Sequence, residues 1–513
     1  MVVGDIIRRN ARRFPKKTAL IFEETSYTFK ELDDRVNRLA NGILSLGHKK
    51  GDRIAIIADN CHQHVEIFCT VAKLGMTYMA ANPFLPVNYL TYIVKNIEAD
   101  TVIFQPKYRD TVNSLKREIS SLRNFIVLGD PVGNEVNYEK FILAHESKNP
   151  DILVHEDDDL LIINTSGTTG FPKQIVHTHK SSLAIALNTL FAHRVTPDDT
   201  GIIATPIFWG PVIPLRVLSH FYLGGSCVIA PEITPECILK TIERGRANHT
   251  MMGTPFLIQL LDHPDIGKYD LSSMRFIALS GIPLSPEILT RAIKVFGSVF
   301  GSVFGNMYAL TECGGIAWLR PDEVVLDGPP EELQRLQSVG REAVNMDVRV
   351  VDDQGKDLPP DIPGEVIVKG DAVMKEYLKA PQITEQTLRN GWLYTGDIAT
   401  MDKEGYLYIQ GRKKDFITTS GNTIVASEIE DIIYQETSVK EAAVIGLPDE
   451  NLGEVVKAFI VLREARELTE EEVIELCKKN LPDFAVPRSV EFVSELPKSA
   501  VGKILKYKLK DMK

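Results

Sequence analysis

Short apolar runs alternate with amphipathic stretches along roughly the first 310 residues of the chain. Thr28 and Glu31 have the spacing of a capping box, which predicts a helix start. The apolar residues that follow recur at spacings of four and three and therefore share one helical face: Leu32, Val36, Leu39, Ile43 and Leu46. Runs typical of buried strands lie between such helices, at residues 53–58, 102–104, 125–128, 160–163, 201–205, 226–230 and 276–280. This alternation predicts an α/β fold with a largely parallel sheet.

The pattern changes beyond residue 320. Residues 347–351 and 364–370, with a turn at 352–355, predict antiparallel β-structure, and residues 404–410 predict a further strand. About 100 residues of mixed strands and helices follow, which is a plausible size for a small domain. We therefore expect a large N-terminal domain, residues 1–411, with layered and mostly parallel sheets plus a β-rich subdomain. A small α+β domain, residues 412–513, is expected after it.

Composition narrows the functional classes. The 513-residue chain has 44% hydrophobic and 25% charged residues, which is ordinary for a soluble protein. A net charge of −11 argues against nucleic acid as a partner, so a polyanionic ligand requires a local positive site. No apolar run approaches the ~20 residues of an integral membrane segment, and the N-terminus has no apolar core of signal-peptide length. The six scattered cysteines form no C-x-x-C pair, which indicates a reduced, cytoplasmic protein. A homo-oligomer and a peripheral membrane association both stay open.

The most informative segment is the loop Thr165–Lys173, which follows the apolar run at 160–163. Its glycines let backbone N–H groups approach a ligand, its hydroxyls add donors, and Lys173 adds one positive charge. That mixture suits a polyphosphate. It is not the Walker pattern, because the lysine follows Pro172 instead of a glycine. The alternative, a flexible linker, is disfavoured because linkers rarely follow a buried strand and end in Pro-Lys.

Four more segments carry candidate chemistry: residues 306–312, 394–397, 411–412 and 497–503. Taken singly, each has an ordinary structural explanation. Tyr308 reads equally as a core aromatic residue, Asp397 as the former of a tight turn, and Lys503 as a solvated lysine near the C-terminus. In this order along one chain, however, the segments resemble the adenylate-forming superfamily. That superfamily comprises acyl-CoA synthetases, aryl-CoA ligases, luciferases and stand-alone adenylation enzymes, and the resemblance covers essentially the whole length.

The resemblance implies a two-step reaction that uses ATP, Mg²⁺ and coenzyme A. A carboxylate attacks the α-phosphate of ATP to give an acyl-adenylate, and a thiol then displaces AMP. In the family's pattern, the phosphate-binding residues correspond to Thr165, Ser166, Gly167, Thr168, Thr169, Gly170 and Lys173. The rest of the nucleotide site corresponds to Ser280, Gly281, Tyr308, Ala309, Thr311, Asp397 and Arg412.

The same pattern assigns individual roles. Tyr308 is expected to stack on adenine, and Asp397 to accept the ribose hydroxyls with Arg412 nearby. The catalytic residues are expected to be Lys503, which would offset the negative charge of the reacting groups, together with Thr311 and Glu312. Glu312 is also the expected Mg²⁺ ligand, for which an oxygen donor is apt.

Further expectations concern the acid, the thiol and the moving domain. Phe208, Trp209 and Ile282 are candidates for the acyl pocket. Lys414 occupies the hinge position about which the small domain would rotate, and Gly421 would line the coenzyme A tunnel. The chain also departs from the family's usual residues. Gln174 and Ala309 stand where glycine is usual, and Trp209 stands where many relatives carry a histidine.

We therefore predict an ATP-dependent carboxylic acid–CoA ligase whose small-molecule acid is fatty, aromatic or alicyclic. One alternative is a stand-alone adenylating enzyme that loads a carrier-protein thiol, and light emission is a remote further one. A different class is a catalytically silent relative that binds nucleotide only. The joint presence of Lys173, Glu312, Asp397 and Lys503 argues against that class.

Overall fold

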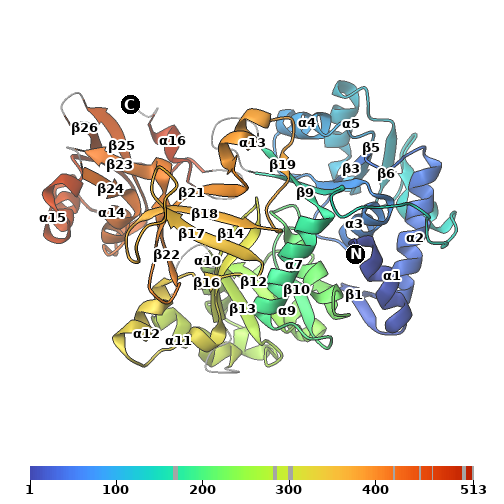
Figure 1. The fold of residues 1–513 in the computed structure, drawn as a ribbon, viewed down its shortest axis with the longest axis horizontal. Helices are drawn as coiled ribbons and strands as arrows, with labels where there is room; N and C mark the ends of the chain where they lie inside the picture. Colours follow the sequence, from blue (N-terminus) through green and yellow to red (C-terminus); the bar gives the residue numbers. More distant parts are fainter. Residues whose placement is uncertain are drawn as a thin grey trace.

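The computed structural model describes residues 1–165, 172–280, 286–297, 304–419, 422–449, 452–464, 466–498 and 504–510. Figure 1 shows the N-terminal helices (blue) at one end of the long axis and the C-terminal sheet (orange to red) at the other. The α-helices of these residues are α1 (Gly4–Arg13), α2 (Phe29–Ser45), α3 (Gln63–Leu74), α4 (Val87–Asn96), α5 (Arg109–Glu118), α6 (Tyr138–Leu143), α7 (His179–His193), α8 (Ser219–Phe221), α9 (Pro235–Gly245), α10 (Thr254–Leu261), α11 (Pro286–Phe296), α12 (Pro330–Gln334), α13 (Pro381–Thr387), α14 (Ala426–Ile433), α15 (Glu470–Asn480) and α16 (Lys506–Leu509). No helix of these residues combines the length and apolar character that crossing a bilayer requires.

The capping box at the start of α2 forms as predicted. The backbone N–H of Glu31 donates to the hydroxyl of Thr28, and the Glu31 carboxylate accepts from the Thr28 N–H at 2.8 Å. The side chains of Leu32, Val36 and Leu39 are fully buried, because their face of α2 packs into the core. Local capping and apolar periodicity therefore agree at this helix.

Nine strands of the described residues form the first large sheet. Their order is β16 (Arg341–Glu342), β15 (Gly314–Leu319), β14 (Phe304–Leu310), β13 (Phe276–Ser280), β12 (His249–Gly253), β10 (Thr200–Ile203), β11 (Ser226–Ile229), β1 (Thr18–Phe22) and β2 (Thr25–Thr28). The pairs from β1 through β14 are parallel, and the outer pairs are antiparallel. The predicted run 276–280 is one strand, β13, with the predicted bounds.

In the described part of the chain, eight strands form the second large sheet. Their order is β19 (Glu376–Tyr377), β9 (Gln174–Thr178), β8 (Asp159–Asn164), β4 (Thr77–Ala80), β3 (Arg53–Ile57), β5 (Thr101–Phe104), β6 (Asn124–Val127) and β7 (Val136–Asn137). One apolar cluster joins the facing sides of the two large sheets and includes α1, α2 and α3. Helices α4 and α5 cover the other side of the second sheet, and α9, α10 and α11 cover the other side of the first. The mostly parallel, layered α/β architecture is confirmed.

A third sheet is antiparallel and contains β17 (Met346–Val351), β18 (Gly364–Gly370), β20 (Leu388–Arg389), β21 (Trp392–Met401) and β22 (Leu407–Arg412). The predicted β-rich region is therefore confirmed, with two corrections. Residues 402–405 form a turn, so the strand predicted at 404–410 begins only at Leu407. Asp397 lies inside β21 and not in a tight turn. Gly396 has a φ of 72°, and this left-handed residue lies beside a register shift in the pairing of β18 with β21 instead of reversing the chain.

The C-terminal part of the chain has a separate sheet and core. The sheet contains β23 (Phe416–Thr419), β24 (Asn422–Val425), β25 (Val439–Asp449), β26 (Gly453–Leu462) and β27 (Ser489–Phe492). Its apolar side chains pack with α14 and α15. In Figure 1 the third sheet lies between this unit and the two large sheets. β22 ends at Arg412 and β23 begins at Phe416, so the change of sheet occurs across the short 3₁₀ turn η6 (Lys413–Asp415).

Candidate active site

Tyr308 and Arg412 are 104 residues apart in the sequence, and the fold brings both into direct contact with Asp397. Tyr308 lies on β14, Asp397 on β21, and Arg412 is paired with Asp397 across β21 and β22. The Tyr308 hydroxyl donates to Oδ2 of Asp397 at 2.5 Å, and Nε of Arg412 lies 2.8 Å from Oδ1. Arg412 also donates to the carbonyl of Thr395 at 3.0 Å. The carboxylate is thus held in one orientation by two side chains from different strands.

The surroundings fix the charge states of this group. Burial, together with the neighbouring Asp397 carboxylate, raises the pKa of Tyr308 well above its usual value. The phenol therefore stays neutral and donates. The Asp397 side chain is only 6% exposed, while its arginine partner is 44% exposed. A buried carboxylate that is paired with an arginine is a suitable acceptor for a vicinal diol such as ribose, so these residues fit a nucleotide.

Lys173, Glu312 and Tyr377 form a second constellation. The Tyr377 hydroxyl donates to Oε1 of Glu312 at 2.7 Å, and Nζ of Lys173 lies 5.0 Å from the centre of the Tyr377 ring. Burial and the Glu312 carboxylate raise the pKa of Tyr377, so it too is a neutral donor. Oε2 of Glu312 has no hydrogen bond to a described residue. An oxygen of this kind fits a hard cation such as Mg²⁺.

Backbone contacts connect the two constellations. Glu312 follows β14, which carries Tyr308, and its carbonyl accepts from the N–H of Met374 at 2.7 Å. His177 of β9 bonds through Nε2 to the carbonyl of Thr311 at 2.9 Å. The first and second large sheets therefore meet at residues 311–312. Sequence reasoning missed Tyr377 and His177, because neither stands in one of the recognised motifs.

The base of the phosphate-loop candidate is held by Gln174. Its side-chain amide donates to the carbonyl of Ile93 at 3.1 Å and to Oδ1 of Asn164 at 2.9 Å, and it accepts from Asn96 at 2.7 Å. The N–H of Thr165 also donates to the carbonyl of Lys173 at 2.9 Å, which joins the two ends of the loop. The departure from glycine at position 174 thus has a structural reason: glutamine fastens α4 to the strand before the loop.

Several predicted site residues lie outside the described residues: Ser166, Gly167, Thr168, Thr169, Gly170, Gly281, Ile282, Gly421 and Lys503. Ser280 ends β13, opposite Gly253 of β12. Ala309 stands on β14 next to a register shift with β15. The roles expected for all of these residues stay predictions, as does the domain boundary after residue 411.

The acyl-pocket candidates differ from each other in exposure. Phe208 is buried, whereas the Trp209 side chain is at the surface, with 40% of the residue exposed. Phe84, which the sequence did not single out, is 68% exposed, and its ring meets Phe208 edge-on at 6.1 Å. The Phe208 and Trp209 rings are also edge-on, at 6.5 Å. The three rings form an aromatic rim, of which only Phe208 belongs to the interior.

The hinge candidate has a specific ionic contact next to it. Nζ of Lys413 lies 2.8 Å from Asp353 and 2.9 Å from Glu365, both in the antiparallel region before β21. Lys414 is the middle residue of η6, directly after this contact. On the far side of the turn, the hydroxyl of Ser427 donates to the carbonyl of Gln410 at 2.8 Å. The hinge role of Lys414 itself stays a prediction.

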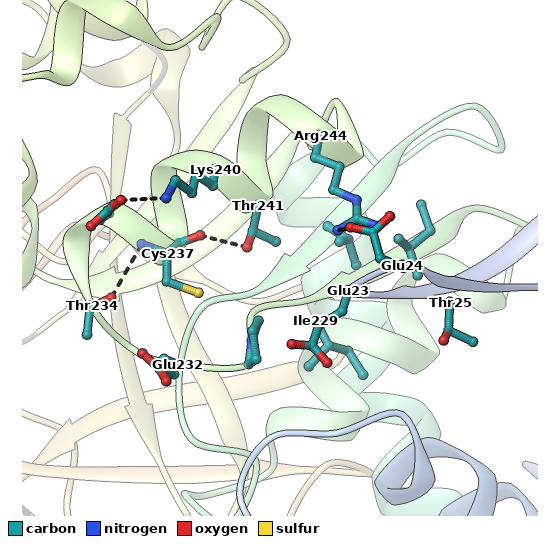
Figure 2. A pocket seen from close by; sticks show the side chains of 14 residues that line it. Glu23, Glu24, Thr25, Ile229, Glu232, Thr234, Cys237, Lys240, Thr241 and Arg244 are labelled. Atoms are coloured by element: carbon teal, nitrogen blue, oxygen red, sulfur yellow. Dashed lines mark hydrogen bonds and ion pairs between the residues drawn. The ribbon is translucent and has the colours of Figure 1, made fainter.

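An open pocket of about 590 Å³ lies elsewhere, beside the carboxyl ends of β1 and β11 (Figure 2). It contains none of the predicted site residues. Figure 2 shows Arg244 directed at Glu24, with which it forms an ion pair at 3.0 Å, and Lys240 is paired with Glu236. The basic groups of this pocket are thus already neutralised within it, in contrast to what a polyanion site requires.

Comparisons with known proteins agree with this geometry. Residues 7–378 match the family model described as AMP-binding enzyme, and residues 428–503 match that of the AMP-binding enzyme C-terminal domain. The chain is 31% identical to a feruloyl-CoA synthase from Amycolatopsis sp, over 97% of this chain and 96% of that protein. It is 30% identical to a long-chain-fatty-acid–CoA ligase of Mycobacterium tuberculosis, over 99% of this chain and 98% of that protein.

A solved structure is similar over the full length. The anthranilate CoA ligase AuaEII in complex with anthranoyl-AMP superposes with a TM-score of 0.86 at 25% identity, covering 100% of this chain and 97% of that one. The predicted enzyme class, an AMP-forming acid–CoA ligase that uses ATP, Mg²⁺ and coenzyme A, is confirmed. The chain belongs to the AMP-binding enzyme family.

Proposed function

We propose that this acid–CoA ligase activates a fatty, aromatic or alicyclic acid at the junction of β14, β21 and β9. The observation that carries the proposal is the convergence of Tyr308, Asp397 and Arg412 with Lys173, Tyr377 and Glu312 at the residues that follow β14. The first three suit adenosine. Lys173 and the hydroxyl-rich loop before it suit the outer phosphates, and Glu312 suits a bound Mg²⁺.

In the first step, a carboxylate oxygen of the acid bonds to the α-phosphorus of ATP while the bond to pyrophosphate breaks. Two anions must meet, so positive charge has to offset their repulsion. Lys173 would hold the departing pyrophosphate, and Lys503 would approach the reacting groups. Mg²⁺ would neutralise phosphate charge when bound. Asp397 would bind the ribose and so hold the adenosine in the position that the attack requires.

In the second step, the thiol of coenzyme A attacks the acyl carbon, AMP leaves, and the thiol proton passes to solvent or to AMP. Here we propose that the small domain rotates about Lys414, which withdraws Lys503 and brings Gly421 to the site. Lys413 is directly beside Lys414. Its ion pairs with Asp353 and Glu365 would therefore either break during that rotation or stay together as one unit.

The class of acid rests on the lining of the sheet face beneath α7. Ile185 of α7, Leu215 and Ala278 of β13 belong to the same apolar cluster as Tyr308. An acid whose carboxylate lies beside Tyr308 would therefore extend along apolar side chains. The similarity to a feruloyl-CoA synthase and to a fatty-acid ligase favours an apolar acid body, aromatic or aliphatic.

The test is acid-dependent pyrophosphate release, measured with a panel of fatty, aromatic and alicyclic acids in the presence and absence of coenzyme A. Release with an apolar acid and formation of its CoA thioester are expected. Thioester formation only with a carrier protein would contradict the proposal that coenzyme A is the thiol acceptor. ATP binding without release for any acid would overturn catalysis altogether.

A variant separates the two steps. Lys503→Ala should slow adenylation by roughly 100- to 1000-fold, the usual loss for one preorganised electrostatic contact, while thioester formation from supplied acyl-adenylate is spared. Equal losses in both steps would show that this lysine has another role.

We also propose a cytoplasmic location, because all six cysteines are unpaired and five of them are buried.

A further inference from the structure

Three histidines and an arginine are buried together near the end of α7, and none of them belongs to the motifs that define the active site. They are His193 at the end of α7, Arg216 in the π-helix η2 (Ile213–Leu218), His220 of α8 and His249 at the start of β12. Arg216 is 3% exposed and the histidines are 0–2% exposed. The rings of His193 and His220 lie 5.6 and 5.4 Å from that of His249.

Most of the side-chain nitrogens of this cluster lack partners among the described residues. Both terminal nitrogens of Arg216 and both ring nitrogens of His193 have no hydrogen bond among the described residues. The same holds for Nε2 of His220, Nδ1 of His249 and Nε1 of Trp318, whose ring meets that of His193 edge-on at 5.2 Å. Buried polar groups in folded proteins almost always have partners, so a concentration of this kind indicates a missing one.

The partner must be chiefly an acceptor. Nδ1 of His220 lies 2.8 Å from the carbonyl of Arg216 and so carries its proton. Nε2 of His249 lies 3.3 Å from Nη2 of Arg275, which can only donate, so the proton of His249 is on the unpaired Nδ1. Arg216, His249 and Trp318 therefore all present N–H groups. His220 alone presents a fixed lone pair.

Charge decides between a neutral and an anionic partner. No ion pair of the described residues includes Arg216. Among the described residues, the carboxylate that lies near the cluster is Asp199, which already binds Arg275 at 2.8 Å and Thr196 at 2.7 Å and lies 3.8 Å from His249. Burial lowers the pKa of Arg216 to about 9, which leaves it charged at neutral pH. An uncompensated buried cation costs several kcal/mol, more than a hydrogen bond to a neutral acceptor returns, so an anion is the matching ligand.

The cluster lies on the same sheet face as the proposed reaction site. Register places His249 beside Phe276 and Gly253 beside Ser280, so Phe276, Ala278 and Ser280 point to one side of β13. The His193 ring stacks on Phe276 at 4.0 Å. Four residues of strand separate Phe276 from Ser280, a span of ~13 Å. Between the ends lie apolar side chains of the cluster that contains Ile185, Leu215 and Ala278.

We propose that Arg216, His193 and His249 form a buried site for a small anion of carboxylate size at the distal end of the acyl pocket. The inference rests on the proposed function, since the pocket's direction follows from adenylation beside Tyr308. The anion has two possible sources: the second carboxylate of a dicarboxylic acid with an apolar body, or a free anion such as chloride that remains bound while a monocarboxylic acid reacts.

The first experiment compares acids in matched pairs on the full-length enzyme: octanoate with octanedioate, decanoate with decanedioate, and cinnamate with 4-carboxycinnamate. kcat/KM is measured in gluconate and in chloride buffers. If the second carboxylate fills the site, one diacid should exceed its monoacid by about 10- to 100-fold, the worth of a hydrogen-bonded charge contact. Chloride should then inhibit the diacid reaction competitively.

If a free anion fills the site, monoacids are preferred and chloride instead raises the melting temperature. A ligand present at 100 times its Kd stabilises a protein by about 2.7 kcal/mol, which is a readily measured shift. Arg216→Met should abolish that shift, and Arg216→Lys should retain part of it. Arg123→Met, which removes a surface arginine paired with Asp100, is the matched control and should leave the shift intact.

For the diacid source, the same variants are compared by the ratio of diacid to monoacid kcat/KM within each protein. Arg216→Met should lower that ratio to near one and Arg123→Met should not change it. The proposal is overturned if the wild-type enzyme turns over both members of every pair equally and its melting temperature is the same in chloride and gluconate. That result would leave the ligase function standing, because monoacid turnover proves it independently. Absence of turnover with every acid would instead defeat the proposed function, while an Arg216-dependent chloride shift would still support the anion site.

Discussion

Two arginines of this ligase show opposite ways of using a cation. Arg412 is half-exposed, pairs with the buried Asp397 and donates to a backbone carbonyl as well. Arg216 is fully buried, and neither of its terminal nitrogens has a partner among the described residues. The first arrangement is complete without a ligand and fixes the orientation of a carboxylate. The second is incomplete, and protein interiors rarely tolerate that state unless something else supplies the missing charge.

The two ends of the proposed acyl path also differ in polarity. Asp397 and Glu312 offer carboxylate oxygens, each with one tyrosine hydroxyl already bound, at 2.5 and 2.7 Å. The far end offers N–H groups. An acceptor-rich end suits ribose hydroxyls and a metal ion, whereas a donor-rich end suits an anion. Substitutions at the two ends should therefore have effects of different kind, and often of different sign.

The largest effect is expected at Asp397. Asp397→Ala removes the acceptor for ribose and leaves the buried hydroxyl of Tyr308 without its partner. Loss of one side of a buried, charge-assisted contact should reduce kcat/KM for ATP by roughly 100- to 1000-fold. Steady-state kinetics at saturating acid measures it. A loss smaller than tenfold would show that this carboxylate supports the fold and not the nucleotide.

The same chemical change at the two arginines should move stability in opposite directions. Arg216→Met removes an uncompensated buried charge and keeps an apolar side chain of similar length, so the free energy of unfolding should rise by about 2 kcal/mol in gluconate buffer. Arg412→Met leaves Asp397 without its cation and should lower it by about 1 kcal/mol. Urea unfolding of both variants checks the pair. Equal signs would end the contrast drawn between them.

Much of the architecture followed from the sequence because local signals agreed with the packing. The capping box at Thr28 and the apolar face of α2 both indicate one helix, and the apolar run at 276–280 predicts the strand β13. Asp397 was misplaced because a glycine before an aspartate usually marks a turn. In β21 the left-handed Gly396 instead lies beside a register shift, and its partner strand β18 is distant in sequence. Non-local pairing of this kind leaves no local pattern.

The site could be predicted where motifs carry it and not where packing alone creates it. The sequence predicts Tyr308, Asp397 and Lys173 as site residues. The structure places the first two in contact and puts Lys173 over the ring of Tyr377, which binds Glu312. Tyr377 belongs to a two-residue strand at the edge of the second large sheet, so the sequence of that segment does not predict a contact with Glu312. Arg216 and the three histidines are spread over 57 residues of chain, and only the packing of α7, η2, α8 and β12 brings them together.

A pH-dependent effect on stability is expected at His220. Burial lowers the pKa of His220 to about 4, below its unfolded value of 6.5, and the ring is flanked by Arg216 and His249. The unfolded state therefore binds the proton first as the pH falls. The stability due to neutral His220 is complete above about pH 6.5 and should be lost at about 1.4 kcal/mol per pH unit between pH 6.5 and 4. His220→Gln should reduce the slope of unfolding free energy against pH by that amount, while a surface substitution such as Arg123→Met should not. An unchanged slope in His220→Gln would mean that this ring is already charged or solvated.

The smallest effect should come from removing the hydroxyl of Tyr308. This change should lower stability while leaving ATP binding nearly unchanged. Tyr308→Phe keeps the ring that is expected to stack on adenine but removes the donor to Asp397 Oδ2. Without nucleotide, the loss of one buried hydrogen bond should lower the free energy of unfolding by about 1 kcal/mol. With nucleotide, ribose hydroxyls and the phenol compete for the same carboxylate, so removal of the phenol should change KM for ATP by less than about fivefold.

The variant therefore separates stability from binding at one atom, with Tyr377→Phe as the matched loss of a hydroxyl beside Glu312. An increase of more than tenfold in KM for ATP would instead show that the Tyr308 hydroxyl itself contacts the nucleotide, and that Asp397 is held for ribose by Arg412 alone.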